Sequence, residues 1–264
     1  MKVAKFSALF LLIVLLSCVQ EPGNRLQELD NRLREEEVVL SRALILRSWA
    51  LETATKIKFD KVPSAKLERL DYGRGQQYAG QYRSETEKII FSVSIWYDLN
   101  VRLAKSLRLA TPQEVAADED FQILADHELG HALADQVSRR SDHGPWFLPE
   151  KMLELKQTEA LGLHVVAEGV GIWFAQALHP SRERYSAQNF PSNPEESRFY
   201  TFEDIVHYGG YWLVRDILNK YGERGLVWLI CHPLTLNGDN MRLAAVTYHE
   251  RALTELAQFQ RPAH

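Results

Sequence analysis

The spacing of apolar residues predicts a long helix in the N-terminal part of the chain. Leucines recur at intervals of three, four and seven, at positions 26, 29, 33, 40, 44 and 51, which is typical of an amphipathic helix lying against a domain. A short tether over residues 19–24 is expected before it. The acidic run Glu35-Glu36-Glu37 interrupts the apolar seam, so a coiled-coil dimer is less favoured.

A β-hairpin is predicted after this helix. Residues 78–82 and 89–96 are rich in β-branched and aromatic side chains, and they flank a polar turn at 83–88. An open edge of such a strand can hold an extended peptide by main-chain hydrogen bonds. An ordinary sheet strand without that role is the equally weighted alternative.

The pattern then becomes helical, and one helix carries the segment His127-Glu128-Leu129-Gly130-His131. Thr111-Pro112 and the acidic run 118–120 supply cap and first-turn signals before it. Histidines four residues apart share one helix face and can reach a single ion, while Glu128, about 100° further round, points at a water on that ion. Zinc with three protein ligands keeps a position for water and lowers its pKa to about 7, so the segment predicts amide hydrolysis. Two histidines with ordinary structural partners are the alternative.

A third ligand must come from downstream, and Glu168 is favoured. It is a carboxylate in an otherwise apolar helical stretch, predicted from about Leu155 to Leu178, where an ionised group needs a partner such as a metal. Gly169 and Gly171 would let this helix approach another closely.

Other interpretations of this stretch stay open. His164 lies one turn before Glu168 on the same face, so it is either a competing ligand or an outer partner of the site. Glu159 and His143 are weaker candidates, and a buried Glu168 paired with an arginine needs no metal.

The histidine-glutamate helix, followed by a helix with a glutamate, a glycine and a small residue, resembles the gluzincin metallopeptidases, which include thermolysin and the M1-type aminopeptidases. The resemblance implies His127 and His131 as zinc ligands, Glu128 as general base and Glu168 as third ligand. It covers about residues 78–232, although only the two motifs are specific. The interval between the motifs is longer than in the aminopeptidases. The Gly-x-Met-Glu-Asn string with which those aminopeptidases hold a free N-terminus is also missing, so endopeptidase action is expected instead of exopeptidase action.

Two more helices are predicted in the C-terminal part. A capping box formed by Thr201 and Asp204 opens one that ends at Tyr221-Gly222, where glycine suits the position after the helix. The last follows the turn at 237–240 and ends near Gln260.

The resemblance also implies a donor for the oxyanion of the tetrahedral intermediate, because a tyrosine or histidine of a later helix has this role in gluzincins. His207 and Tyr208 are favoured without a choice between them, and Tyr211 is also eligible. Aromatic packing with no catalytic role is the alternative.

The N-terminus predicts a lipid anchor. Lys2 and Lys5 precede an apolar run from Phe6 to Leu16, and Leu15-Leu16-Ser17-Cys18 resembles the lipobox of a bacterial lipoprotein signal peptide. We therefore expect cleavage before Cys18 and its acylation, which anchors a chain to a membrane without a transmembrane helix. A plain secretory signal is the alternative. The expected location is the bacterial cell envelope, outside the cytoplasm.

Net charge and cysteine content limit the partners and the covalent crosslinks that we expect. Removal of residues 1–17 takes away two lysines and no acidic residue, so the formal net charge changes from −4 to −6, which argues against nucleic acid as a partner. With Cys18 acylated, only Cys231 remains, so no intramolecular disulfide can form. Cys231 follows the apolar run 226–230 and is expected to be a buried thiol.

Together these patterns predict an α+β fold. A signal peptide (1–17) and an anchored helical arm (18–60) precede a predominantly helical zincin-like domain (61–264) with a small β-sheet before the motif helix. The expected function is that of a membrane-anchored metallopeptidase with one Zn²⁺ ion and protein or peptide substrates. A non-catalytic lipoprotein that binds an envelope partner is the alternative, and a structural zinc site with His164 as fourth ligand is a third interpretation.

Overall fold

The computed structural model describes residues 22–68, 80–103, 110–140, 157–178, 207, 209–232 and 254. Its helices are α2 (Pro22–Thr55), α3 (Val93–Leu103), α4 (Pro112–Ala117), α5 (Glu119–Ser138), α7 (Gln157–Ala177) and α9 (Gly210–Cys231), and its strands are β1 (Ser64–Glu68), β2 (Gly80–Arg83) and β3 (Lys88–Ser92). The described part is therefore α+β and mostly helical, with a small sheet before the motif helix, as predicted.

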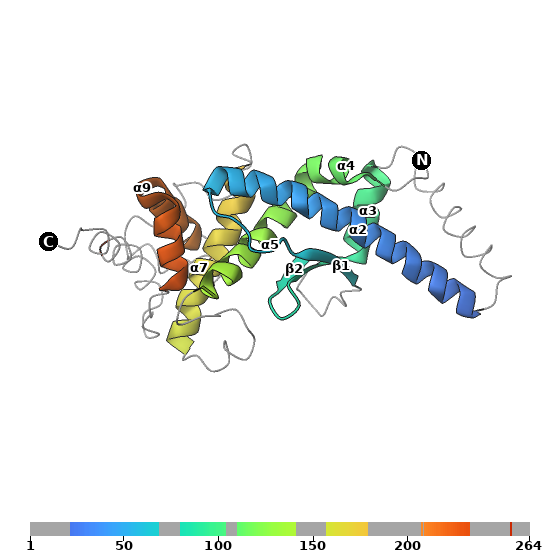
Figure 1. Ribbon diagram of the computed structural model, residues 1–264, viewed down its shortest axis with the longest axis horizontal. Coiled ribbons are helices and arrows are strands. Elements are labelled where there is room, and N and C mark those ends of the chain that lie inside the picture. Colours follow the sequence, from blue (N-terminus) through green and yellow to red (C-terminus); the bar gives the residue numbers. More distant parts are fainter. Residues whose placement is uncertain are drawn as a thin grey trace, which may run out of the picture.

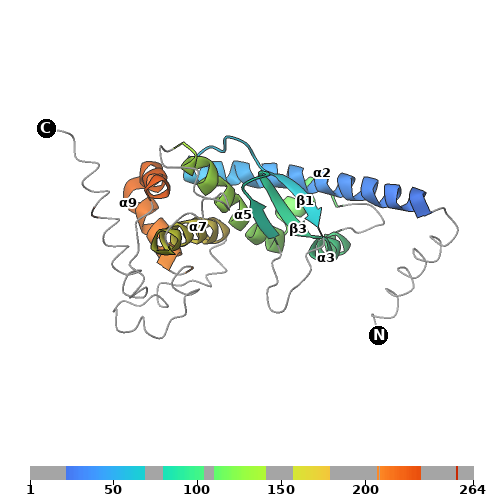
Figure 2. The ribbon, with the colours of Figure 1, turned by 90° about the horizontal axis from the view of Figure 1, so that it is seen from below.

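Helix α5 lies at the centre of this arrangement (Figures 1 and 2). Strand β2 packs on one side of α5 and helix α7 on another, while α9 packs on α7. Helix α2 crosses β1, α4 and α5. The elements that approach α5 therefore come from both ends of the chain.

The sheet has the strand order β1-β3-β2, with β1 parallel and β2 antiparallel to β3. The β2–β3 pair is the predicted hairpin, in which Tyr82 lies opposite Ile89. Helix side chains meet the outer side of β1: the Ala65 amide donates to Ser41 Oγ at 2.9 Å, and the Leu67 amide donates to Glu37 Oε1 at 3.0 Å. The sheet is thus bound to α2 along this edge.

The second predicted strand is wrong over residues 93–96, because the chain enters α3 at Val93. Val93, Trp96, Leu99 and Leu103 recur at intervals of three and four, and all four pack in or against the core. The indole N–H of Trp96 also donates to Glu36 Oε2 of α2 at 2.7 Å. Tertiary contacts that need helical spacing therefore override the β propensity of these residues.

The long N-terminal helix is confirmed as α2, but it begins at Pro22, so the tether predicted over residues 19–24 is wrong from that position onward. Proline is compatible with the first turn of a helix, because no intrahelical hydrogen bond needs its missing N–H there. Leu40, Leu44 and Leu51 are fully buried, so the second half of α2 is part of the core.

Residues 1–21, with the predicted signal peptide and Cys18, lie outside the described residues. In the segments that are described, no helix combines the length and the apolar character needed to cross a membrane.

The predicted cap signals before the motif are confirmed, and they start two helices in succession. Thr111 and Glu114 form a capping box at the start of α4. Asp118 then ends α4 and caps α5 by accepting a hydrogen bond from the Phe121 amide at 3.0 Å. The hydrogen bond from the Phe121 amide to Asp118 therefore sets the residue at which the motif helix begins.

Helix α7 is confirmed within two residues of its predicted bounds. Helix α9 differs at its end, because Gly222 has the positive φ of 63° expected after a helix, yet the chain resumes a helical course to Cys231. Leu226 and Leu229 on this extension are fully buried, and their burial holds it against the core. Thr201, Asp204 and the predicted last helix lie outside the described residues, except for position 254.

Cys231 is buried, as predicted, and its thiol lies 3.7 Å from the Val137 carbonyl oxygen. Burial raises the pKa of the Cys231 thiol, which keeps it protonated and unreactive at neutral pH.

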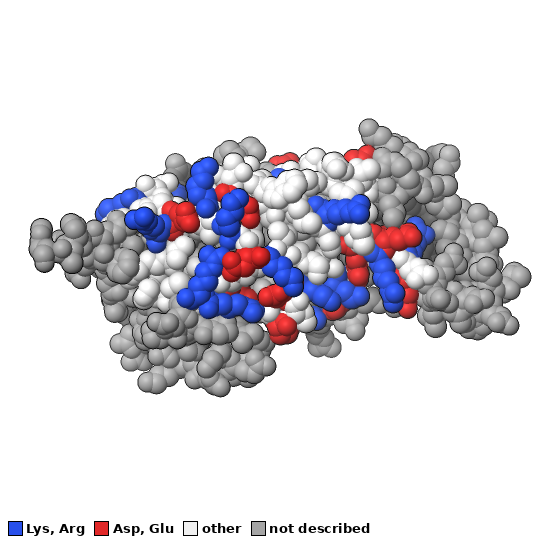
Figure 3. All heavy atoms as spheres, viewed as in Figure 1, with Lys and Arg blue, Asp and Glu red and all other residues white. Residues whose placement is uncertain are grey.

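Positive and negative side chains are interspersed on the face of the molecule seen in Figure 3. Ion pairs of the described residues include Lys61–Glu87 at 2.9 Å and Arg140–Asp60 at 2.6 Å, whose side chains are 30–68% exposed. Exposed pairs typically contribute about 0–1 kcal/mol each. Their removal would change the stability of the fold little.

One ion pair is buried and joins α2 to the motif helix. Arg47 donates from Nε to Asp126 Oδ1 at 2.9 Å and from a terminal nitrogen to Oδ2 at 2.5 Å. Asp126 is fully buried and directly precedes His127. The pair therefore fixes both the distance from α2 to α5 and the rotation of α5 at the start of the motif.

We expect Arg47→Met to destabilise the fold by about 3–5 kcal/mol, because it leaves the Asp126 carboxylate buried without its cation. The double variant Arg47→Met/Asp126→Leu should lose much less, since no uncompensated charge remains. Arg42→Met, at an exposed position of the same helix, serves as the control and should change stability by less than about 0.5 kcal/mol. Urea unfolding measures all three, and equal losses in Arg47→Met and Arg42→Met would contradict this assignment.

Candidate metal centre

Helix α5 places the two motif histidines one turn apart. Their imidazole rings stand nearly perpendicular, with an interplanar angle of 88° and centroids 4.6 Å apart. The Nε2 atoms of His127 and His131 face each other at 2.9 Å. Both lone-pair-bearing nitrogens can therefore reach the same point.

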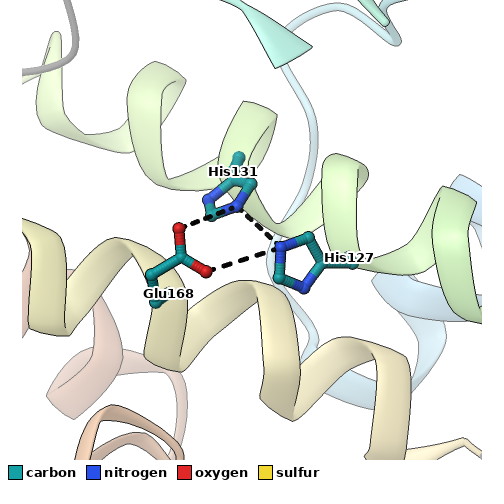
Figure 4. Close-up of side chains that lie close together, drawn as sticks. All are labelled: His127, His131 and Glu168. Atoms are coloured by element: carbon teal, nitrogen blue, oxygen red, sulfur yellow. Dashed lines mark hydrogen bonds and ion pairs between the residues drawn. The ribbon is translucent and has the colours of Figure 1, made fainter. Parts of the chain in front are cut away.

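Glu168 approaches these nitrogens from α7 (Figure 4). Its Oε2 lies 3.6 Å from His127 Nε2, and its Oε1 lies 3.7 Å from His131 Nε2. The three side chains are 17–26% exposed, so the group is partly accessible to solvent. One ligand atom from each residue lies within 4.8 Å of the others.

This donor group fits a single metal ion. Ligand bonds of about 2.0–2.1 Å in a tetrahedral arrangement require ligand atoms about 3.3 Å apart. The two imidazole nitrogens are 2.9 Å apart, and a different Glu168 oxygen lies 3.6 or 3.7 Å from each of them, so either oxygen lies near this spacing from one histidine. Two imidazole nitrogens and one carboxylate oxygen are also ligands that divalent transition metals accept. Among the described residues, His127, His131 and Glu168 are the one group of this kind.

Two glycine contacts bring α7 this close. A Cβ on Gly130 would lie 2.7 Å from Gly171 Cα, so the backbones of α5 and α7 touch at this point. A Cβ on Gly169 would collide with the backbone of Gly210 at the start of α9. The close approach predicted for Gly169 and Gly171 is confirmed, and Glu168 directly precedes the first of them.

The protonation states suit metal ligation. Burial, together with the neighbouring His131, lowers the pKa of His127 to about 3, so its ring is neutral at physiological pH. Burial would raise the pKa of Glu168, but the charge of His131 and the hydrogen bond from His207 outweigh it and hold this pKa well below its usual range. The group thus offers a neutral imidazole and an ionised carboxylate.

Glu128 is buried on the side of α5 that faces the sheet. Its Oε2 accepts a hydrogen bond from the Tyr82 amide of β2 at 2.6 Å. Burial raises the pKa of Glu128, whereas the charge of His131 and the Tyr82 hydrogen bond oppose this increase. Glu128 is therefore a carboxylate beside the metal-ligand group with one oxygen held by the backbone.

Of the three eligible oxyanion donors, His207 lies at the site. Its Nε2 is 3.5 Å from Glu168 Oε2, and its side chain is 38% exposed. Tyr208 lies outside the described residues. Tyr211 is buried, and its ring packs against Trp212 with centroids 5.7 Å apart.

The alternative ligands are placed differently. His164 is exposed and lies outside the group of ligand atoms, so neither predicted role for it, as competing ligand or outer partner, finds support in its position. His143 and the side chain of Glu159 lie outside the described residues.

Tyr82 of the edge strand β2 contacts the site, although the sequence did not indicate a role for it. The amide of Tyr82 is occupied by Glu128, so this position of the edge cannot bind a peptide backbone while that bond exists. Its partner is 46 residues away in the chain, and no local pattern marks the contact. Peptide binding along the rest of the edge stays a prediction.

Comparisons of the chain with family models, with curated proteins and with solved structures found no match.

Glu168→Ala should weaken zinc binding by more than the roughly 10–100-fold that loss of an outer partner costs, because one of three ligand side chains is removed. His164→Ala is the matched control from the same helix, one turn away and exposed, and should bind zinc as the parent does. Competition with a chromogenic chelator measures both affinities. Equal losses in the two variants would exclude Glu168 as a ligand.

Gly171→Ala should lower zinc affinity about 10-fold or more while Glu168 stays intact, because a disoriented ligand binds poorly. The new methyl group would lie 3.0 Å from the His127 ring and 3.1 Å from the His127 carbonyl oxygen, so the ring must shift. Chelator competition gives the affinity, and urea unfolding of the metal-free protein measures the separate folding cost. Parent-like affinity in a folded variant would show that the glycine does not set the ring position.

Proposed function

We propose that this chain is a zinc-dependent metallopeptidase of the gluzincin type that hydrolyses peptide bonds within proteins. The observation that supports this most directly is the convergence of His127, His131 and Glu168 from two helices beside the buried carboxylate of Glu128. The order of elements is also the one expected for a zincin-like domain, since a small sheet precedes the motif helix and the helix that bears the third carboxylate comes after it.

The donor set favours zinc. Two histidines and one glutamate are the protein ligands of a known class of catalytic zinc sites, which keep a further position for water or substrate. A zinc ion bound there would activate a water molecule and polarise the substrate carbonyl. His164 is exposed and lies outside the group of described ligand atoms, so a structural site closed by His164 is disfavoured.

The remaining steps can be assigned to side chains of this chain. Glu128 accepts the proton of the attacking water and delivers it to the leaving amine, a role suited to a carboxylate whose pKa is raised by burial. The Tyr82 amide holds one Glu128 oxygen during both transfers. His207, whose Nε2 lies 3.5 Å from Glu168 Oε2, is the described candidate for the hydrogen-bond donor to the oxyanion.

We also propose that the enzyme acts in the bacterial cell envelope, held to the membrane by lipid on Cys18. The support is the lipobox-like sequence that ends at this cysteine. Helix α2 begins four residues after Cys18, so little chain would separate the anchor from this helix.

Glu128→Gln should retain zinc and lose about 10²–10⁴-fold in turnover, because the ligands remain while the proton acceptor is gone. His131→Ala is the contrasting variant and should lose the metal itself. Metal analysis and cleavage of a peptide library measure the two properties. A Glu128→Gln protein that cleaves as fast as the parent would exclude this mechanism.

The substrates can be sought in an envelope proteome exposed either to the parent or to Glu128→Gln. New protein N-termini should appear only with the parent enzyme. Identical sets of N-termini, together with specific retention of an envelope protein by both forms, would instead support binding without turnover.

A further inference from the structure

Helix α5 contacts one residue of the edge strand at two points. The Tyr82 amide donates to Glu128 Oε2 at 2.6 Å, and the Tyr82 hydroxyl donates to Asp135 Oδ2 at 2.8 Å. Glu128 and Asp135 are seven residues apart, which places them on the same face of the helix two turns from each other. A single tyrosine therefore links the proposed general base to a second carboxylate of the same helix.

The Asp135 end of this link is firmly held. Asp135 is fully buried, and its Oδ2 also accepts hydrogen bonds from Ser84 Oγ at 3.0 Å and from Arg139 at 2.7 Å. Arg139 further donates to the Ser84 carbonyl oxygen at 2.9 Å. A buried carboxylate with a cation and two hydroxyl donors costs free energy to displace, because three hydrogen bonds to one buried oxygen would be lost.

The hydrogen bond between the Tyr82 amide and Glu128 depends on the position of strand β2. Strand β2 has four residues, pairs with β3 on one side and has α5 on the other. Short peripheral elements with few buried contacts open locally at a low cost in free energy, so side chains that join β2 to α5 restrict the movement of the strand. The Tyr82 amide can stay within hydrogen-bond distance of Glu128 only while the strand keeps its position.

We propose that the Tyr82 hydroxyl and Asp135 are positioning residues for Glu128. Together they hold β2 against α5 so that the Tyr82 amide fixes one oxygen of Glu128 and leaves the other for proton transfer. A glutamate without this bond samples several rotamers, and a base must be correctly placed before its pKa matters. The inference rests on the proposed role of Glu128, but the contact itself can be tested without turnover.

The first test is amide hydrogen exchange on the full-length protein, read at residue level by mass spectrometry. Tyr82→Phe keeps the ring and the amide and removes only the hydroxyl. The amide of residue 82 should exchange about tenfold faster, as expected when one hydrogen bond is weakened, while the amides of β3 stay protected. Glu128→Ala should give the same local increase, because it removes the acceptor.

Ser84→Ala is the matched control. It removes another hydroxyl that donates to Asp135 Oδ2 but leaves both contacts of Tyr82 in place. Exchange at residue 82 should then match the parent. Unchanged protection in Tyr82→Phe, or equal loss at residue 82 and throughout β3, would overturn the inference whether or not the protein is a peptidase.

The second test separates positioning from stability. On a peptide cleaved by the parent, Tyr82→Phe should lower kcat about tenfold with unchanged KM and zinc content, whereas Ser84→Ala should retain the parent kcat. A purely structural role predicts equal kcat in both variants once the folded fraction is matched. Full kcat in Tyr82→Phe, with exchange at residue 82 increased, would show that the contact exists but does not position the base.

Discussion

The structure depends on one close approach, where the backbones of α5 and α7 meet at Gly130 and Gly171 with no side chain between them. Packed helices are usually 8–10 Å apart, and side chains fill the space. Because the two backbones touch, Glu168, one turn before Gly171, lies directly over the motif histidines. The contact of Gly169 with Gly210 fixes α7 from its other side. The residues that allow the approach therefore also determine where the carboxylate lies.

The motif helix is restrained around its whole circumference. Successive residues of a helix point about 100° apart, and three consecutive residues of α5 contact three different elements: Asp126 with Arg47 of α2, His127 with Glu168 of α7, and Glu128 with Tyr82 of β2. Rotation of α5 about its axis would break at least one of these contacts. The side chains of the proposed site are thus oriented by the packing of the domain before any ion or substrate binds.

The sequence predicts what depends on neighbours in the chain. The helical spacing of the histidines, the cap at Asp118 and the carboxylate of Glu168 in an apolar stretch all follow from short patterns. The structure brings the two histidines and Glu168 together. The strand predicted over residues 93–96 fails because contacts with α2 decide between helix and strand there. The bonds from Tyr82 to Glu128 and from Arg47 to Asp126 join residues 46 and 79 positions apart, so no local pattern marks them.

The small sheet has a further property that concerns aggregation. A three-stranded sheet exposes two edges, and unpaired edge amides are templates for pairing with other chains. Here helix side chains accept from amides on both outer strands: Ser41 and Glu37 from β1, and Glu128 from β2. The proposed catalytic base thereby also covers part of an edge. Such side-chain acceptors would protect a sheet this small from edge-to-edge pairing without extra strands.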